Sequence, residues 1–269
     1  MATTFADVAA AIGAYAPWGL QESYDNSGLL VGLPGTEVRG VILCLDVTPD
    51  VIEEAQRLGA NLIVSHHPLI FSGLKRMISP EGPAGMVVEC IRREIGVIAA
   101  HTNLDSTTNG VSYALGARLG LQGMQPLSPH PQAVQAGDGL GVVGNLKAPL
   151  PRDAFLSFVL EGVPTEVLRH SRVGEAHSVA RVALCGGSGA ELIGQAKACG
   201  ADAYITADLK YHDFQRGGEH LLLLDVGHHE SEMVAVELLH SIITNNFTSF
   251  AVCNSECEIS PLGYYYNKN

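Results

Sequence analysis

The sequence lacks long apolar runs, a dense set of cysteines and an excess of basic residues. No stretch reaches the roughly 20 apolar residues that a membrane-spanning helix needs, which excludes an integral membrane protein of that type. Six cysteines in 269 residues are too sparse for a disulfide framework and indicate a reducing compartment. Only 16 Lys and Arg stand against 28 Asp and Glu, so broad nucleic-acid binding through a basic face is not expected.

The N-terminal residues carry no basic segment, and their apolar residues recur with helical spacing, which argues against a signal peptide. We therefore expect a soluble, cytoplasmic protein. A composition that is 46% hydrophobic and 6% aromatic, with 30 glycines, favours a compact α/β fold with one large or two modest cores.

Hydrophobic patterning predicts strands and helices in alternation along the chain. Thr4 is expected to cap a first helix that ends near Tyr15, and a polar turn at Asp25 and Asn26 leads into a short strand. Residues 122–139, rich in Pro, Gly and Gln, are expected to connect two halves, 1–125 and 126–269. Further strands are predicted at 41–45, 62–65, 97–100, 141–146, 182–185 and 221–224, and helices at 49–58, 81–94, 112–119, 155–160, 190–198 and 228–243, with a glycine-rich turn at 186–189.

A pair of histidines follows the central predicted strand. The β-branched run at 62–64 predicts a buried parallel strand, and Pro68 ends it just after His66 and His67. Open α/β sheets place their sites at the carboxyl ends of such strands. Because neighbouring strand residues point to opposite sides, this pair is better placed to hold one ion each of two than to chelate one ion together.

The chain also contains an internal repeat. Placing residues 41–67 on 182–208 aligns identical residues at Val41 and Val182, Leu43 and Leu184, Cys44 and Cys185, Ile52 and Ile193, Ala55 and Ala196, Gly59 and Gly200, and Ala60 and Ala201. We infer two related strand-helix-strand halves.

Each half offers a histidine followed four residues later by a carboxylate, just beyond a predicted strand. These pairs are His101 with Asp105 and His228 with Glu232. The second pair opens a predicted helix, where residues four apart share one face, whereas His229 and Glu230 are expected to point elsewhere.

Together these segments supply more ligands than one ion needs. Three imidazoles and two carboxylates suit two divalent ions that share a bridging group, and Fe, Mn, Zn, Co and Ni all remain open because the set contains no thiolate. The sequence therefore predicts a dinuclear metal site in the cleft between the halves, formed by His66, His67, Asp105, His228 and Glu232.

Five segments resemble the signatures of the dinuclear-metal family named for the NGG-one interacting factor, whose bacterial members are often labelled GTP cyclohydrolase I type 2. They are residues 25–29, 65–68, 101–105, 206–212 and 227–232. Tyr24 stands where many relatives have tryptophan, and Ala207 where glycine is usual. The resemblance implies the same five metal ligands, two α/β halves and a ring-shaped homohexamer.

The implied activity is hydrolysis that depends on two metal ions, with GTP as the suggested substrate and its imidazole ring opened at C8. In this interpretation His101 and His212 transfer protons, Lys210 contacts phosphate, and Asp25 and Asn26 contact the substrate. Structural hydrogen bonds or solvated charges explain these residues equally well. The alternative function is a protein that handles metal ions or binds partners without turnover.

Overall fold

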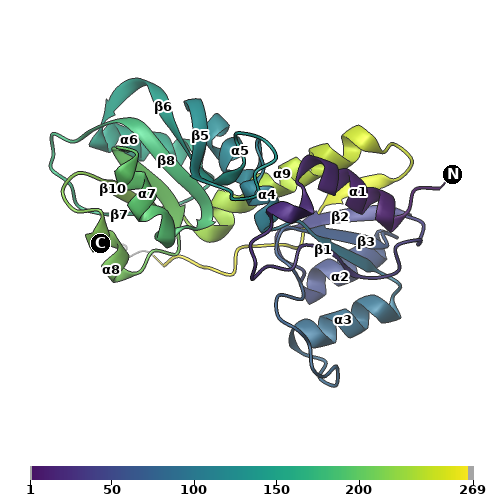
Figure 1. Cartoon of the computed structure of the whole chain (residues 1–269). Helices are drawn as coiled ribbons and strands as arrows, with labels where there is room; N and C mark the ends of the chain where they lie inside the picture. The colour runs from purple at the N-terminus through teal and green to yellow at the C-terminus, as the bar shows by residue number, and fades with distance from the viewer. Residues whose placement is uncertain (1, 266–269) are drawn as a thin grey trace.

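The computed structural model describes residues 2–265 and contains two lobes, each built around one sheet (Figure 1). The first sheet has the order β1-β4-β3-β2-β11, in which only β1 is antiparallel to its neighbour. Its strands are β1 (Gly28–Val31), β2 (Gly40–Cys44), β3 (Leu62–Ser65), β4 (Gly96–Ala99) and β11 (Ala251–Asn254).

Helices cover both faces of this sheet because its strands are apolar on both sides. Ile42 and Ile63 pack with α2 (Pro49–Arg57) and α3 (Gly82–Arg92). The opposite face packs against α1 (Phe5–Tyr15) and α9 (His228–Asn246). Thr4 caps α1 as predicted, with its side chain accepting from the Asp7 backbone N–H. The short helices η1 (Trp18–Leu20), α4 (Thr102–Ser106) and α5 (Val111–Arg118) lie toward the second lobe.

The second sheet has the order β5-β6-β8-β9-β10-β7, with parallel pairing between β8 and β9 and between β9 and β10. Its strands are β5 (Gln122–Pro129), β6 (Gly139–Pro151), β7 (Arg169–His170), β8 (Ser178–Ser188), β9 (Ala203–Ala207) and β10 (Leu222–Asp225). The associated helices are α6 (Arg152–Gly162), η2 (Ala190–Leu192), α7 (Ile193–Ala198) and α8 (Tyr211–Arg216).

The internal repeat is present in three dimensions with the same strand register in both halves. Val41 pairs with Leu62 in the first sheet, and Val182 pairs with Ala203 in the second. Gly59 and Gly200 both end their helices with φ of 72°, a left-handed conformation that favours glycine. The sequence repeat therefore corresponds to a repeated β-α-β unit.

The two lobes share a hydrophobic core, and the chain returns from the second lobe to the first. One hydrophobic cluster runs from Val41 and Leu62 in the first sheet to Val182 and Ile205 in the second, with α9 packed between them. The last strand, β11, returns to pair in parallel with β2. The expected boundary at 125/126 falls inside β5, and β11 lies in the first sheet.

Two sequence predictions were wrong in detail. The expected connection at 122–139 begins with β5, an edge strand that tolerates Pro126 and Pro129 because one of its sides has no neighbour. The expected turn at 186–189 is largely strand, because β8 continues through Ser188. None of the helices in residues 2–265 is both long and apolar enough to cross a bilayer.

Candidate metal centre

The predicted ligands converge where strand ends of the two lobes meet. His66 and His67 directly follow β3, and Asp105 lies in α4, which follows β4. His228 is the first residue of α9, and Glu232 lies one turn later. The α-helical spacing places both on one face, as predicted. Segments far apart in the sequence therefore bring their side chains to one cluster.

Glu232 is the centre of this cluster. Its Oε2 lies 2.9 Å from His67 Nε2 and 3.0 Å from His228 Nε2, and these two nitrogens are 3.4 Å apart. Its Oε1 is 3.8 Å from His66 Nε2. The two oxygens of one carboxylate thus face two neighbouring subsites, one beside His66 and Asp105 and the other beside His67 and His228.

The subsite beside His66 and Asp105 contains two buried atoms without a hydrogen-bond partner. They are His66 Nε2 and Asp105 Oδ1, which are 3.6 Å apart. Buried polar atoms are rarely left without a partner, and this separation is too long for a hydrogen bond. Two ligands bonded tetrahedrally to one ion at about 2.0–2.2 Å would be separated by roughly 3.3–3.6 Å. The residues present therefore fit a divalent metal ion.

A fourth imidazole belongs to the same cluster. Ligand atoms of His66, His67 and His101 lie within 4.8 Å of one another, and those of His67, His228 and Glu232 form a second such group. The sequence predicted proton transfer for His101. Its position beside two expected ligands makes it a further candidate ligand.

All four imidazoles form a hydrogen bond through Nδ1, so that Nε2 of each ring remains available to bind metal. A metal-ligating histidine typically uses its other nitrogen to contact a carboxylate or a backbone carbonyl, which selects the tautomer and the ring orientation. The acceptors are Ala100 O for His66 at 2.8 Å, Asp46 Oδ1 for His67 at 3.0 Å, Asp25 Oδ1 for His101 at 2.8 Å and Asp208 Oδ2 for His228 at 2.7 Å.

The electrostatics of the cluster favour binding of positive charge. Burial lowers the pKa of His67, but hydrogen bonds to Asp46 and Glu232 outweigh it and raise that pKa to about 10. The hydrogen bond to Glu232 is the main reason that the pKa of His228 is raised to about 9. Burial alone would raise the pKa of Glu232, yet hydrogen bonds to the imidazoles hold it well below its usual value. Without metal, protons on imidazole balance the carboxylates, and a divalent cation would replace them.

Gly187 provides the space that Glu232 occupies. A Cβ on this residue would lie 1.9 Å from Glu232 Oε1, and its φ of 63° also disfavours a side chain. Its N–H donates to Ser231 Oγ at 2.9 Å, which ties β8 to the first turn of α9. Close helix packing, rather than a phosphate cradle, therefore explains this part of the glycine-rich segment.

Asp25 and Asn26, which were expected to contact substrate, instead form hydrogen bonds within the protein. The Asp25 side chain is fully buried and accepts from Thr102 N–H at 3.0 Å while it contacts His101, so it orients His101 and does not face a ligand. Asn26 Nδ2 donates to Ile70 O at 2.6 Å.

His212 and Lys210 lie at the start of α8, near the outer end of the second lobe (Figure 1). His212 contacts Tyr211 and Gln215. No hydrogen bond or ion pair within residues 2–265 joins His212 or Lys210 to the imidazole cluster.

Sequence reasoning did not identify the residues that orient the ligands. Asp46 and Asp208 each hold one imidazole, and Gly187 makes room for the bridging carboxylate. Two signals in the sequence pointed to Asp208: the internal repeat aligns it with His67, and it lies within the family-like segment 206–212.

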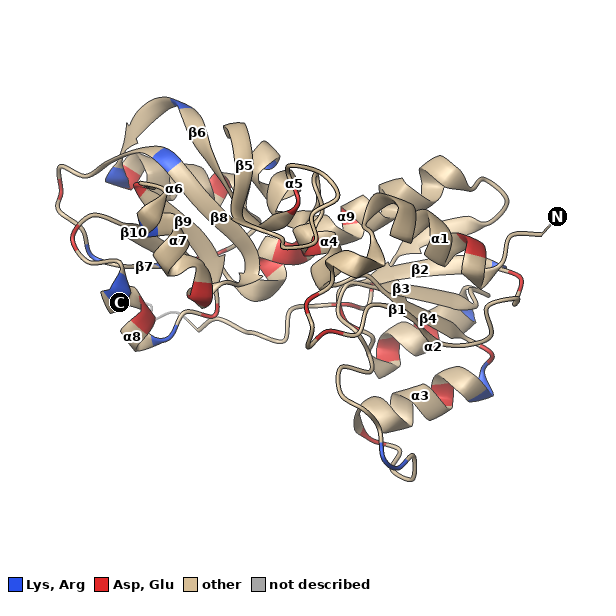
Figure 2. Cartoon of the chain, in the orientation of Figure 1, with Lys and Arg blue, Asp and Glu red and all other residues tan. Residues whose placement is uncertain are grey.

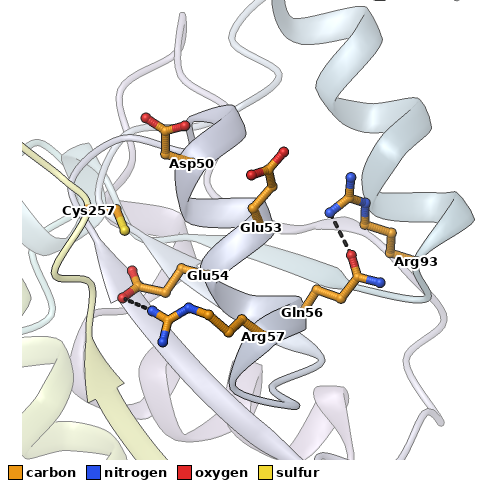
Figure 3. Close-up of a pocket in the computed structure, with 7 residues that line it drawn as sticks. All are labelled: Asp50, Glu53, Glu54, Gln56, Arg57, Arg93 and Cys257. Atoms are coloured by element: carbon orange, nitrogen blue, oxygen red, sulfur yellow. Dashed lines mark hydrogen bonds and ion pairs between the residues drawn. The ribbon is translucent and has the colours of Figure 1, made fainter.

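Acidic residues lie near the cluster (Figure 2), and a large hollow lies elsewhere on the molecule. Figure 2 shows acidic residues around α4, where the two lobes meet. A separate hollow of about 770 Å³ lies against α2, away from the imidazoles, and Figure 3 shows its side chains. It is lined by Asp50, Glu53, Glu54, Gln56, Arg57, Arg93 and Cys257.

Comparisons with known proteins identify relatives of this chain and a shared fold. The chain is 35% identical over 235 residues to a Streptomyces coelicolor protein named GTP cyclohydrolase 1 type 2 homolog, covering 86% of this chain and 82% of that one. A Nostoc protein of the same name is 37% identical over 201 residues, covering 74% and 75%. A crystal structure of a Staphylococcus aureus hypothetical protein matches with a TM-score of 0.89 and 27% identity, covering 98% of this chain and all of that one. The model of the Duf34/NIF3 (NGG1p interacting factor 3) family matches residues 3–261, and the chain therefore belongs to that family.

Proposed function

We propose that this protein is a hydrolase that depends on two divalent metal ions. The observation that carries the proposal is the pair of partnerless buried atoms, His66 Nε2 and Asp105 Oδ1, beside the carboxylate of Glu232. A structural histidine would be expected to satisfy both ring nitrogens, whereas His66 satisfies only Nδ1. One ion would be held by His66, Asp105 and Glu232, and the other by His67, His228 and Glu232.

When bound, such a pair of ions supplies Lewis acidity and lowers the pKa of water. The protein's part is to hold the donors rigidly. Asp46 and Asp208 orient His67 and His228, and Glu232 spans both subsites because Gly187 leaves room for it. Rigid donors reduce the reorganisation that charge development in a transition state would otherwise require.

We assign His101 to the edge of the metal centre beside His66 and His67, as a donor or as a proton carrier at Nε2. Asp25 accepts from Nδ1 and would stabilise the imidazolium form. We assign no proton transfer to His212, because its ring contacts Tyr211 and Gln215 and not the cluster.

We further propose that the substrate is a nucleotide, with GTP as the first candidate, on the basis of the family resemblance and the names of the relatives. An exposed aromatic pair beside the cluster supports a planar substrate. The Tyr24 and Phe71 rings are 6.4 Å apart, and Phe71 is 6.3 Å from His101. Their exposed fractions of 62% and 50% leave ring faces open to stack on a base.

Formate release tests the enzyme proposal. Metal-free protein would be loaded with Fe, Mn, Zn or Co and incubated with GTP, with the Glu232→Ala variant as the control for contaminating activity. We expect metal-dependent formate from the parent protein and none from the variant. Equal formate from both proteins, or none with any of the four metals, would rule out GTP ring opening.

One observation favours the second candidate function, metal handling without turnover. His101 adds a donor beside His66 and His67, and a site saturated by protein ligands has no open position for substrate. Cobalt-loaded protein distinguishes the two functions: a substrate-induced change in the Co²⁺ absorption spectrum supports the hydrolase, and rapid ion release without such a change supports metal handling.

The proposal includes the homohexamer that the resemblance implies. Leu33, Ile78 and Ile91 are large apolar side chains with exposed fractions of 75%, 82% and 59%, and an assembly would be expected to cover part of this surface. Sedimentation velocity of the purified protein tests it, and a monomer at micromolar concentration would contradict it.

A further inference from the structure

The chain segment after β11 lies beside the metal centre. Ser255 N–H donates to Leu43 O at 2.8 Å, which continues the pairing of β11 along β2. Glu258 then reaches the residues that follow β2. Its Oε2 accepts from Leu45 N–H at 2.7 Å and its Oε1 from Asp46 N–H at 2.6 Å. Both oxygens of one carboxylate are therefore used to hold the backbone of residues 45 and 46.

The backbone that Glu258 holds is the one that orients His67. Asp46 Oδ1 contacts His67 Nδ1 at 3.0 Å, and His67 N–H donates to Leu45 O at 2.8 Å. His67 Nε2 in turn faces Glu232 Oε2 at 2.9 Å. A continuous chain of contacts thus runs from Glu258 through Asp46 and His67 to the centre.

Asp46 needs this support because its own side chain is poorly enclosed. The side chain is 54% exposed, so packing alone does not select its rotamer, whereas His67 is 23% exposed. Hydrogen bonds that backbone N–H groups donate to an ionised carboxylate are among the stronger hydrogen bonds in proteins. Two of them at residues 45 and 46 would restrict the position from which Asp46 reaches the imidazole.

The segment has a second, independent anchor. Glu54 is 3% exposed and accepts from Ser255 Oγ at 2.6 Å and from Glu256 N–H. Figure 3 shows Glu54 and Cys257 on the same side of α2. Because Glu54 holds the segment at residues 255 and 256, a change at Glu258 can alter the support of Asp46 without detaching the segment.

We propose that Glu258 is a positioning residue of the metal centre, acting on the subsite of His67 through Asp46. The inference rests on the proposed metal function and adds to it a residue from the C-terminal segment. Replacing residues that orient metal ligands typically weakens metal binding about 10- to 100-fold. We expect Glu258 to show an effect of this kind on one of the two ions.

Cobalt titration of the metal-free full chain tests the proposal, with the Co²⁺ absorption spectrum and stoichiometry as readouts. The variants are Glu258→Gln, Asp46→Asn and the double variant, and Glu256→Gln is the matched control because that side chain is exposed and lies two residues away. We expect about 10- to 100-fold weaker binding of one ion and an altered spectrum for each single variant. The double variant should bind that ion only slightly more weakly than Asp46→Asn does, because both residues act through His67. The control should bind Co²⁺ as the parent protein does.

The possible outcomes distinguish failure of the metal function from failure of the positioning role. A parent protein that binds no Co²⁺ would refute the metal function and this inference with it. Parental binding with an unchanged Glu258→Gln variant would refute the positioning role alone, as would an equal loss in Glu256→Gln. Glu258→Asp, which keeps the charge, should recover part of the affinity, and a loss as large as that of Glu258→Gln would also count against the proposal.

Discussion

His67 follows a strand of the first sheet and Glu232 lies on α9, which packs between the two sheets, and His67 Nε2 lies 2.9 Å from Glu232 Oε2. The strand end that carries His67 and the helix that carries Glu232 are separated by most of the chain. Their contact joins the segment after β3 to the start of α9 at the metal centre.

Loss of Glu232 should reduce metal content more than loss of Asp105. Glu232 faces both subsites, whereas Asp105 contacts only the one beside His66. We expect Glu232→Ala to lose both ions and Asp105→Ala to lose mainly one, with affinity losses of at least about tenfold. Elemental analysis per chain after dialysis measures this.

The neighbours His229 and Glu230 provide the controls for that experiment. They belong to the same helix turn, but within residues 2–265 no hydrogen bond or ion pair joins either side chain to the imidazoles or to Glu232. His229→Ala and Glu230→Ala should keep nearly the parental metal content. Equal losses in all four variants would show that the shared helix face does not select the ligands.

Substitution of Gly187 should displace the bridging carboxylate. In Gly187→Ala, the new Cβ would meet Glu232 Oε1, in addition to the strain of a positive φ. Gly120→Ala is the control, because its φ of 65° imposes the same strain while nothing lies within 4 Å of its Cβ. Both variants should lose about 1–3 kcal/mol of unfolding free energy, measured by urea denaturation. Only Gly187→Ala should also lose metal, and full metal retention there would refute the steric argument.

Asp25→Asn should disturb the orientation of His101. The side chain at position 25 is buried, so the change should act through His101 and not through contact with solvent or substrate. The amide cannot accept from His101 and from Thr102 with the strength of a carboxylate. We expect metal affinity to fall about tenfold or more, measured by competition with a chelator. Asp153→Asn, at a carboxylate that is 78% exposed, should have no effect. An unchanged Asp25→Asn variant would show that the carboxylate of Asp25 is not needed to orient His101 for metal binding.

Asp138 should make stability depend on pH in the acid range. Burial raises the pKa of this carboxyl, but hydrogen bonds from Gln135, Thr108 and Val134 outweigh it, and the folded-state pKa is lowered. Its stabilising contribution is therefore complete above the unfolded-state pKa of about 4 and is lost as the pH falls through the lower folded-state pKa. Asp138→Asn should reduce the acid dependence of the unfolding free energy. An identical pH profile for the variant would contradict this.

The sequence by itself determined many of the strands and helices and supplied five metal-ligand candidates. The β-branched run at 62–64 and the stop at Pro68 placed His66 and His67 at a strand end, and helical spacing paired His228 with Glu232. The repeat predicted the β-α-β unit whose register recurs in both sheets. These features follow from local rules that act over a few residues, so they can be recognised without knowledge of tertiary contacts.

Only the tertiary structure decided how the candidates are oriented and supported. Asp46, Asp208 and Asp25 select the imidazole nitrogen that faces the centre, Gly187 leaves space for Glu232, and Glu258 arrives from a strand that returns to the first sheet. Each of these contacts joins residues that are distant in sequence or lie on different elements. Spacing within one strand or helix specifies a face, but the packing of elements against one another decides what that face meets.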